Sequence, residues 1–293
     1  MPNPRDIRRR IRSVKSTAQI TKAMQMVAAA KMRKAQQAAL AGRPYAILMN
    51  RVLAEVVPQA GDFAHPLTEK REVRKRGIVA VGTDKGLCGA LNSNLARELM
   101  KYDRTTTVFV TAGRKASQFL ARTKRQLVGE FTYKDSPLFE EARAISRAVR
   151  QMFINGEVDQ VEVLFTQFIN TLSQKPRIIQ FLPVKEIKPI MSDARGEPEP
   201  EEVKTGVGLE YLFEPSADTV LGAVLPHYLN YIMYQILLEA RASEQSARMV
   251  AMKNATDNAN QLIKDLTLEY NKLRQSNITK ELLEIASAQM ALG

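Results

Sequence analysis

The segment GTDKGLCG, residues 82–89, comes closer than any other part of this sequence to a recognisable binding motif. It follows an apolar run and precedes a helical stretch, the place where α/β folds often bind phosphate. Its glycines, Gly82, Gly86 and Gly89, fit neither G-x-G-x-x-G nor G-x-x-x-x-G-K-[ST], and Asp84 would put a carboxylate where an anion has to sit. We therefore predict a surface turn with sterically required glycines rather than a nucleotide site.

The single cysteine and the two histidines are the other side chains that could do chemistry. Cys88 has no basic or histidine partner in sequence that would mark it as a nucleophile, and alone it cannot form an internal disulfide. His65 and His227 are too few for a zinc site built from Cys and His. We predict a partly buried, inert thiol, a loop histidine at 65, a helix start at 227, and no metal, cofactor or catalytic residue.

Positive charge is concentrated at the N-terminus. The chain has a net charge of +12, and residues 1–42 contain ten basic residues against one acidic residue. Such a segment could bind nucleic acid, an anionic membrane surface or an acidic protein, or could be a solvated helix face. A basic coiled-coil nucleic-acid-binding protein is therefore the alternative function, although the first 44 residues lack the aromatic side chains that stack on bases.

Two long segments without glycine or proline must form the main helices. Between Pro4 and Gly42 the spacing alternates between three and four residues, as in a heptad seam. The seam residues are Ile7, Ile11, Val14, Ala18, Thr21, Gln25, Ala28, Met32, Ala35 and Ala39. From His227 to Leu292 a helix bounded by Pro226 could reach about 100 Å, which is longer than a compact domain is wide. We predict an antiparallel coiled coil of the two chain ends.

The middle of the chain alternates between strands and helices. Residues 77–83, 105–112 and 158–168 read as strands, with weaker candidates at 177–182 and 211–213. Helices are predicted near 92–101, 113–122 and 136–154. This order is typical of an α/β domain with a largely parallel sheet, followed by an exposed acidic loop at 192–208. No apolar run of eighteen residues occurs, and the N-terminus is too basic for a signal peptide, so we expect a cytoplasmic location or one against the cytoplasmic face of a membrane.

Several long segments resemble the gamma subunit of bacterial-type F-type ATP synthases. They are IRRRIRSVKSTAQITKAMQMVAAAKMRKAQ, GTDKGLCGALNSNL, FINTLSQ and EQSARMVAMKNATDNANQLIKDLTLEYNKLRQSNITKELLEI, and they cover both ends and the middle of the chain. The resemblance implies an α/β protein in which a long antiparallel coiled coil of the terminal helices joins a central Rossmann-like domain. We divide the chain into a coiled-coil helix at 1–57, a Rossmann-like domain at 73–190, an acidic loop and weak strand at 191–215, and a coiled-coil helix at 216–293.

The resemblance also implies a function. The chain would be the central rotor shaft that couples proton translocation through the membrane sector to ATP synthesis and hydrolysis, a non-catalytic subunit of the complex. Its implied partners are three alpha and three beta subunits, the epsilon subunit and the c-ring, with no nucleic acid. The implied location is peripheral, on the cytoplasmic side of the cell membrane. The single cysteine and the lack of an inserted segment argue against the redox control of chloroplast members.

Site residues follow from the resemblance by motif. It places Arg274, Gln275 and Thr279 of LRQSNIT against a loop of a beta subunit, and Met24 of ITKAM near the acidic lever of another. It places Lys85 and Cys88 of TDKGLCG on a turn that faces the same lever. Met24 could instead be seam packing, and Lys85 a solvated turn residue.

Overall fold

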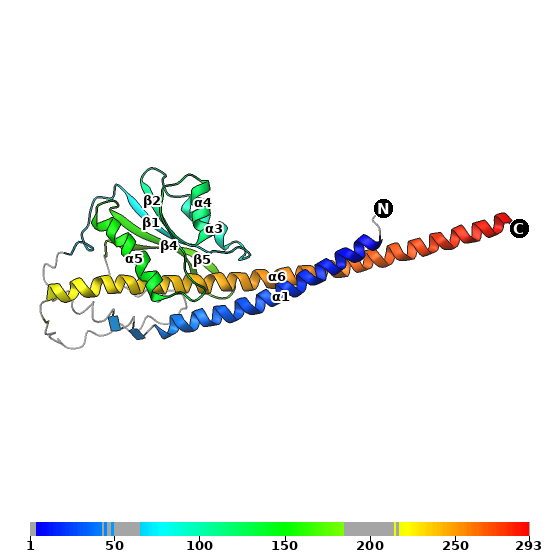
Figure 1. Cartoon of the computed structure of the whole chain (residues 1–293), viewed down its shortest axis with the longest axis horizontal. Helices are drawn as coiled ribbons and strands as arrows, with labels where there is room; N and C mark the ends of the chain where they lie inside the picture. Colours follow the sequence, from blue (N-terminus) through cyan, green and yellow to red (C-terminus); the bar gives the residue numbers. More distant parts are fainter. Residues whose placement is uncertain are drawn as a thin grey trace. The chain divides into compact units, whose positions relative to one another are not determined.

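The computed structural model describes residues 4–42, 44–45, 48–49, 65–184, 214 and 217–292 (Figure 1). The acidic loop predicted at 192–208 and the weak strand at 211–213 lie outside these residues. The chain divides into two compact units, one of residues 1–27 with 249–293 and the other of residues 28–248.

The N-terminal helix, α1 (Pro4–Ala41), follows the predicted heptad seam. Every seam residue is buried or half-buried. Because many of these side chains are small, the helix can approach its partner closely but buries little apolar area. In the first unit the hydroxyls of Thr21 and Thr256 lie 2.7 Å apart, and Arg8 donates to the hydroxyl of Tyr270. Residue numbers therefore rise along one helix as they fall along the other, which confirms the antiparallel coiled coil.

The C-terminal helix, α6 (Ala217–Leu292), starts ten residues before His227, near the beginning of the segment 216–293 that was assigned to this helix. The expectation that Pro226 bounds the helix was wrong, because Pro226 lies inside it. A proline inside a helix costs roughly 3 kcal/mol. Leu221 and Leu225 before it and Leu229 after it are all buried, so packing of this end outweighs the lost hydrogen bond. None of the described helices is long and apolar enough to cross a membrane.

A five-stranded sheet forms the centre of the second unit. Its strands are β1 (Arg76–Val81), β2 (Thr107–Ala112), β3 (Leu127–Phe131), β4 (Gln160–Phe168) and β5 (Gln174–Leu182). They lie in the order β3-β2-β1-β4-β5, and only the β4–β5 pair is antiparallel. The fold class, the three main strands and the weaker candidate at 177–182, which lies within β5, are confirmed. Sequence analysis missed β3, a short edge strand with Gly129 at its centre and Val128 exposed, because its apolar pattern is weak.

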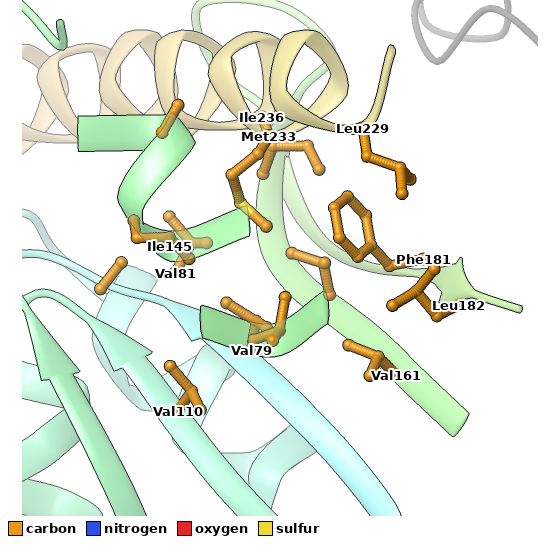
Figure 2. Packing of buried hydrophobic residues seen from close by; sticks show 14 of the residues in the cluster. Val79, Val81, Val110, Ile145, Val161, Phe181, Leu182, Leu229, Met233 and Ile236 are labelled. Carbon is orange, nitrogen blue, oxygen red and sulfur yellow. The ribbon is translucent and has the colours of Figure 1, made fainter. Parts of the chain in front are cut away.

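Helices cover both faces of the sheet, as in a doubly wound domain. On one face α3 (Leu91–Leu99) and α4 (Arg114–Arg122) pack on Ile78, Phe109 and Leu164. On the other face α5 (Phe139–Ile154) and the first part of α6 share a core with Val79 and Val163. Figure 2 shows Leu229, Met233 and Ile236 of α6 in this core, together with Val79 and Phe181 of the sheet. The domain therefore uses α6 as one of its own core helices.

Replacing glycine by alanine should destabilise the protein more at Gly113, in the turn between β2 and α4, than at Gly156. Gly113 has a φ of 114°, and a Cβ there would lie 2.5 Å from the carbonyl oxygen of Gly82. We expect Gly113→Ala to lower the free energy of unfolding by about 3 kcal/mol or more, since backbone strain and a clash with main-chain atoms add together. The control is Gly156→Ala, where φ is 73° but a Cβ meets nothing within 4 Å, and the expected loss is only about 1 kcal/mol. Urea unfolding of both variants checks this, and equal losses would contradict it.

Candidate functional site

Three charged residues of α6 are buried against each other in the second unit. Arg241 Nη1 donates to one carboxylate oxygen of Glu244 at 2.5 Å, and Arg248 Nη2 donates to the other at 2.7 Å. The side chains of Arg241, Glu244 and Arg248 are only 3%, 2% and 10% exposed. Spacings of three and four residues place them on one helix face. Because an unpaired buried charge is very unfavourable, these three residues, here called the α6 charge cluster, depend on one another.

Arg241 ties the cluster to the segment that follows β3. Its Nη2 donates to the carbonyl oxygens of Tyr133 at 3.1 Å and Lys134 at 2.9 Å, and its guanidinium lies 4.5 Å from the centre of the Tyr133 ring. Asp135 adds an ion pair with Arg241 at 3.6 Å and a second with Lys31 of α1 at 2.5 Å. The hydrogen bond from Lys31 holds the pKa of Asp135 below its usual value. One carboxylate thus joins α1 to α6.

Arg248 of the cluster and the nearby Ser246 bind the segments that follow β1 and β4. Arg248 Nη2 donates to the carbonyl oxygen of Gly86 at 3.2 Å and lies 3.5 Å from that of Lys85. Ser246 Oγ donates to the carbonyl oxygen of Thr171 at 2.8 Å. Residues 241–248 of α6 therefore bind the segments that leave the carboxyl ends of β1, β3 and β4.

This position is the one where doubly wound folds usually bind their ligands. The connection that leaves β1 runs to β2 on one side, and the connection that leaves the neighbouring strand β4 runs to β5 on the other side. Ligands bind such folds at this switch point between two strands. Here the side chains of the α6 charge cluster occupy this position and bind the backbone after β1 and β3. Asp84 Oδ1 also accepts a hydrogen bond from the backbone N–H of Arg114 at 3.0 Å, so a carboxylate already occupies the N-terminus of α4. Both features support the prediction that GTDKGLCG is not a nucleotide site.

The GTDKGLCG turn exposes some of its residues and buries others. Lys85 is exposed, whereas Cys88 is 1% exposed and its sulfur accepts a hydrogen bond from Asn92 Nδ2 at 3.3 Å. Burial raises the pKa of the Cys88 thiol, which disfavours the reactive thiolate, and this agrees with the predicted inert thiol. Gly89 has a positive φ of 59°, as a sterically required glycine should. The same expectation was wrong for Gly86, where a Cβ would meet nothing within 4 Å.

The histidines have separate surroundings, both in the second unit. His65 lies in a loop, as predicted, and its Nδ1 accepts a hydrogen bond from the backbone N–H of Leu67 at 3.1 Å. His227 lies within α6, with Nε2 2.6 Å from the hydroxyl of Tyr45. Across the described residues, no three His, Cys, Asp or Glu side chains are grouped so that they could hold a metal ion.

The remaining predicted site residues lie in the first unit. Arg274, Gln275 and Thr279 are exposed on α6, and Thr279 Oγ1 donates to the carbonyl oxygen of Gln275 at 2.9 Å. Every residue from Arg274 to Met290 is exposed, including the large apolar side chains of Ile278, Leu282, Leu283, Ile285 and Met290. Met24 is half-buried on α1. The contacts predicted for these residues involve other subunits, so they stay predictions.

Sequence reasoning missed the α6 charge cluster and its partners Lys31 and Asp135. Charged residues at spacings of three and four usually lie on a solvated helix face, so their spacing alone does not indicate burial. A signal was available in ARASEQSARM, where small residues separate the charges. Small side chains let other segments approach a helix closely, and such an approach would bury the charges between them.

Comparisons with known proteins agree over the whole chain. A family model described as ATP synthase matches residues 3–292. The chain is 49% identical to the ATP synthase gamma chain of Opitutus terrae over 292 residues, which cover 99% of both chains. It is 45% identical to the ATP synthase gamma chain of Methylacidiphilum infernorum, with both chains fully covered.

Solved structures of larger assemblies contain similar chains. One is from the central stalk and c-ring of the Tetrahymena thermophila mitochondrial ATP synthase, with a TM-score of 0.60 and 25% identity over 80% of this chain and 99% of that one. Another is from the Euglena gracilis mitochondrial ATP synthase, with a TM-score of 0.68 and 21% identity over 99% of this chain and 94% of that one. The second similarity concerns the fold alone.

The α6 charge cluster predicts that removing a buried carboxylate lowers the free energy of unfolding far more than removing an exposed one. We expect Glu244→Ala to lower the free energy of unfolding by about 3–5 kcal/mol, because it leaves two buried guanidinium groups without their carboxylate. The control is Glu72→Ala, which removes an ion pair with Arg74 at 2.9 Å on the surface of the same unit. This variant should unfold close to wild type, since exposed pairs contribute little. Urea unfolding followed by circular dichroism measures both, and similar midpoints for the two variants would refute the assignment.

Proposed function

The chain belongs to the family of ATP synthase gamma chains, so it is the central stalk of an F-type ATP synthase. We propose that this subunit turns as a shaft and has no active site of its own. Rotation links proton flow through the membrane sector to ATP synthesis and hydrolysis in a ring of three alpha and three beta subunits. The ring holds the nucleotides, and the shaft changes their binding by its angle.

The α6 charge cluster is the observation that carries this proposal. A shaft that transmits torque must not slip where its globular domain meets its helices. Within residues 28–248, the cluster and Asp135 connect α6 to α1, to the GTDKGLCG turn and to the segment after β3. Breaking such a buried pair costs several kcal/mol, so the junction behaves as a rigid joint under load. The same joint occupies the position that a nucleotide-binding enzyme would keep open.

Contacts between the shaft and the surrounding ring should be weak by comparison. Every contact made at one angle has to be broken before the next angle is reached, so tight binding at any angle would stall rotation. Arg274–Met290 of α6 expose both polar and apolar side chains, which suits a surface that meets several partners in turn. The contacts must also differ between the three beta subunits, because a ligand shifts an equilibrium only through differential affinity.

We assign the contacts with beta subunits to the residues that the family resemblance indicates. Arg274, Gln275 and Thr279 would meet a beta-subunit loop, and Met24 and Lys85 the acidic lever of another beta subunit. Arg274, Gln275 and Lys85 are exposed and available for such contacts. Cys88 is buried, so its part in the contact would be to shape the turn rather than to touch a partner.

The remaining proposals concern the other binding partners of this subunit and its location in the cell. We propose that the epsilon subunit and the c-ring bind this subunit, and that it is peripheral to the cell membrane on the cytoplasmic side. The basic face of the N-terminal segment would then meet acidic segments of beta subunits. Family membership favours this reading over the nucleic-acid-binding coiled coil that the charge alone also allowed.

Replacing the two exposed polar residues of α6 should impair coupling without impairing assembly. Arg274→Ala combined with Gln275→Ala should lower the rates of both ATP hydrolysis and proton-driven ATP synthesis at least about tenfold, because a charge-assisted hydrogen bond to the ring is lost. Arg274→Lys should fall between this variant and wild type, since lysine lacks the planar fork of donors. The rates are measured in reconstituted vesicles after subunit stoichiometry has been verified.

The matched control replaces two neighbouring exposed residues of the same helix. Asn271→Ala combined with Lys272→Ala removes similar polar side chains one turn or less away, where no contact is assigned. It should turn over at the wild-type rate. If both double variants retain full activity, Arg274 and Gln275 are ordinary surface residues.

A subunit without an active site should not bind nucleotide by itself. We expect the purified chain to show no ATP hydrolysis and no stoichiometric ATP binding at micromolar concentration, because side chains of α6 occupy the switch point. Isothermal titration calorimetry, with the assembled alpha–beta–gamma complex as the positive control, measures this. A saturable ATP site on the free chain would contradict the proposal.

A further inference from the structure

Leu87 is the apolar residue that the GTDKGLCG turn presents to solvent. Its side chain is 64% exposed, and its backbone has a positive φ of 61°. Bulky residues rarely adopt this left-handed conformation, which glycine adopts without strain. Gly86 and Gly89 lie nearby on the same turn, yet at position 87 the chain has a strained and exposed leucine instead. Such strain persists where the surrounding structure imposes it, and it is concentrated at functional sites.

The turn is held from its inner side by side chains of three other elements. Tyr133 donates its hydroxyl to the carbonyl oxygen of Gly82 at 3.0 Å, and Arg248 donates to that of Gly86 at 3.2 Å. Thr83 Oγ1 lies 2.9 Å from both the carbonyl oxygen of Lys85 and Oδ1 of Asn92. Leu87 therefore projects outward from a turn whose backbone is fixed, and a partner would find it already in place.

The charged groups around the turn have both signs. Lys85 is exposed two residues before Leu87, and Lys31 is 41% exposed. Two carboxylates are described here: Asp84 accepts a hydrogen bond from the backbone N–H of Arg114, and Asp135 is paired with Lys31 and Arg241. Among the described residues, none of these ion pairs includes Lys85. An apolar side chain two residues from the exposed Lys85 fits a partner segment that carries both aliphatic and acidic side chains.

We propose that Leu87 is the apolar anchor through which the turn contacts an acidic segment of a beta subunit. This inference rests on the proposed function and makes it more specific. The resemblance places Lys85 and Cys88 on the side facing the beta subunit, but Cys88 points into the protein and Leu87 points out of it. Lys85 then provides the charge complement, and Leu87 the contact that is buried when the shaft reaches the matching angle.

Substitutions at position 87 in the assembled alpha–beta–gamma complex test this. Leu87→Gly should slow steady-state ATP hydrolysis about tenfold, which corresponds to the loss of one buried leucine contact. The variant subunit should be at least as resistant to thermal unfolding as wild type, because glycine adopts a φ of 61° without strain. Loss of activity without loss of stability distinguishes a partner contact from a structural role.

The matched control is Lys124→Gly, the other described non-glycine residue with a positive φ, at 53°. It relieves the same kind of strain and removes an exposed side chain elsewhere on the domain, and the complex should keep its wild-type rate. Leu87→Lys and Leu87→Glu test the charge of the partner, since an acidic segment should tolerate lysine at least about tenfold better than glutamate.

Three results would overturn the inference. They are wild-type turnover in Leu87→Gly, an equal loss in Leu87→Gly and Lys124→Gly, and equal rates for the Lys and Glu variants. In each of these cases the wild-type chain still co-purifies with alpha and beta subunits and supports their activity, so the proposed function stands. Failure of the wild-type chain to assemble with them would overturn the proposed function and this inference together.

Discussion

Three charges buried on one helix across the carboxyl ends of a parallel sheet are the interaction on which the second unit depends. Arg241, Glu244 and Arg248 can lie there only because they pair with each other and because the guanidinium groups bind backbone carbonyls of the segments after β1 and β3. Removing water from charges is unfavourable, so the geometry tolerates little displacement. That intolerance gives the domain and its long helix a fixed relation within residues 28–248.

The cluster also supports the proposal that this doubly wound domain does not bind a nucleotide. Doubly wound sheets bind ligands at the switch point between two strands, and in this chain α6 crosses that place and uses its hydrogen-bonding groups. Fold class alone would have suggested an enzyme. The side chains at the switch point instead suit a mechanical role, because they are already paired with groups of the same chain.

A rotor needs strong contacts inside itself and weak, angle-dependent contacts with its partners, and the buried and exposed parts of α6 suit these two needs. Residues 241–248 have buried, charged contacts, whereas Arg274–Met290 are exposed throughout. The GTDKGLCG turn combines both requirements at a smaller scale. Tyr133 and Arg248 donate hydrogen bonds to two of its carbonyl oxygens, while the side chains of Lys85 and Leu87 are exposed.

The sequence by itself determined the two long helices, the heptad seam, three strands and the family. These depend on local periodicity and on long runs of residue identity, which can be read without knowing what lies nearby. Tertiary structure alone decided that α6 continues through Pro226, that Glu244 is a buried carboxylate, and that Cys88 faces inward while Leu87 faces outward. Each of these depends on packing between segments far apart in sequence, such as Asp135 with Lys31 and Arg248 with Gly86. Burial and partner choice are properties of that packing, so a charged or apolar letter in the sequence does not reveal them.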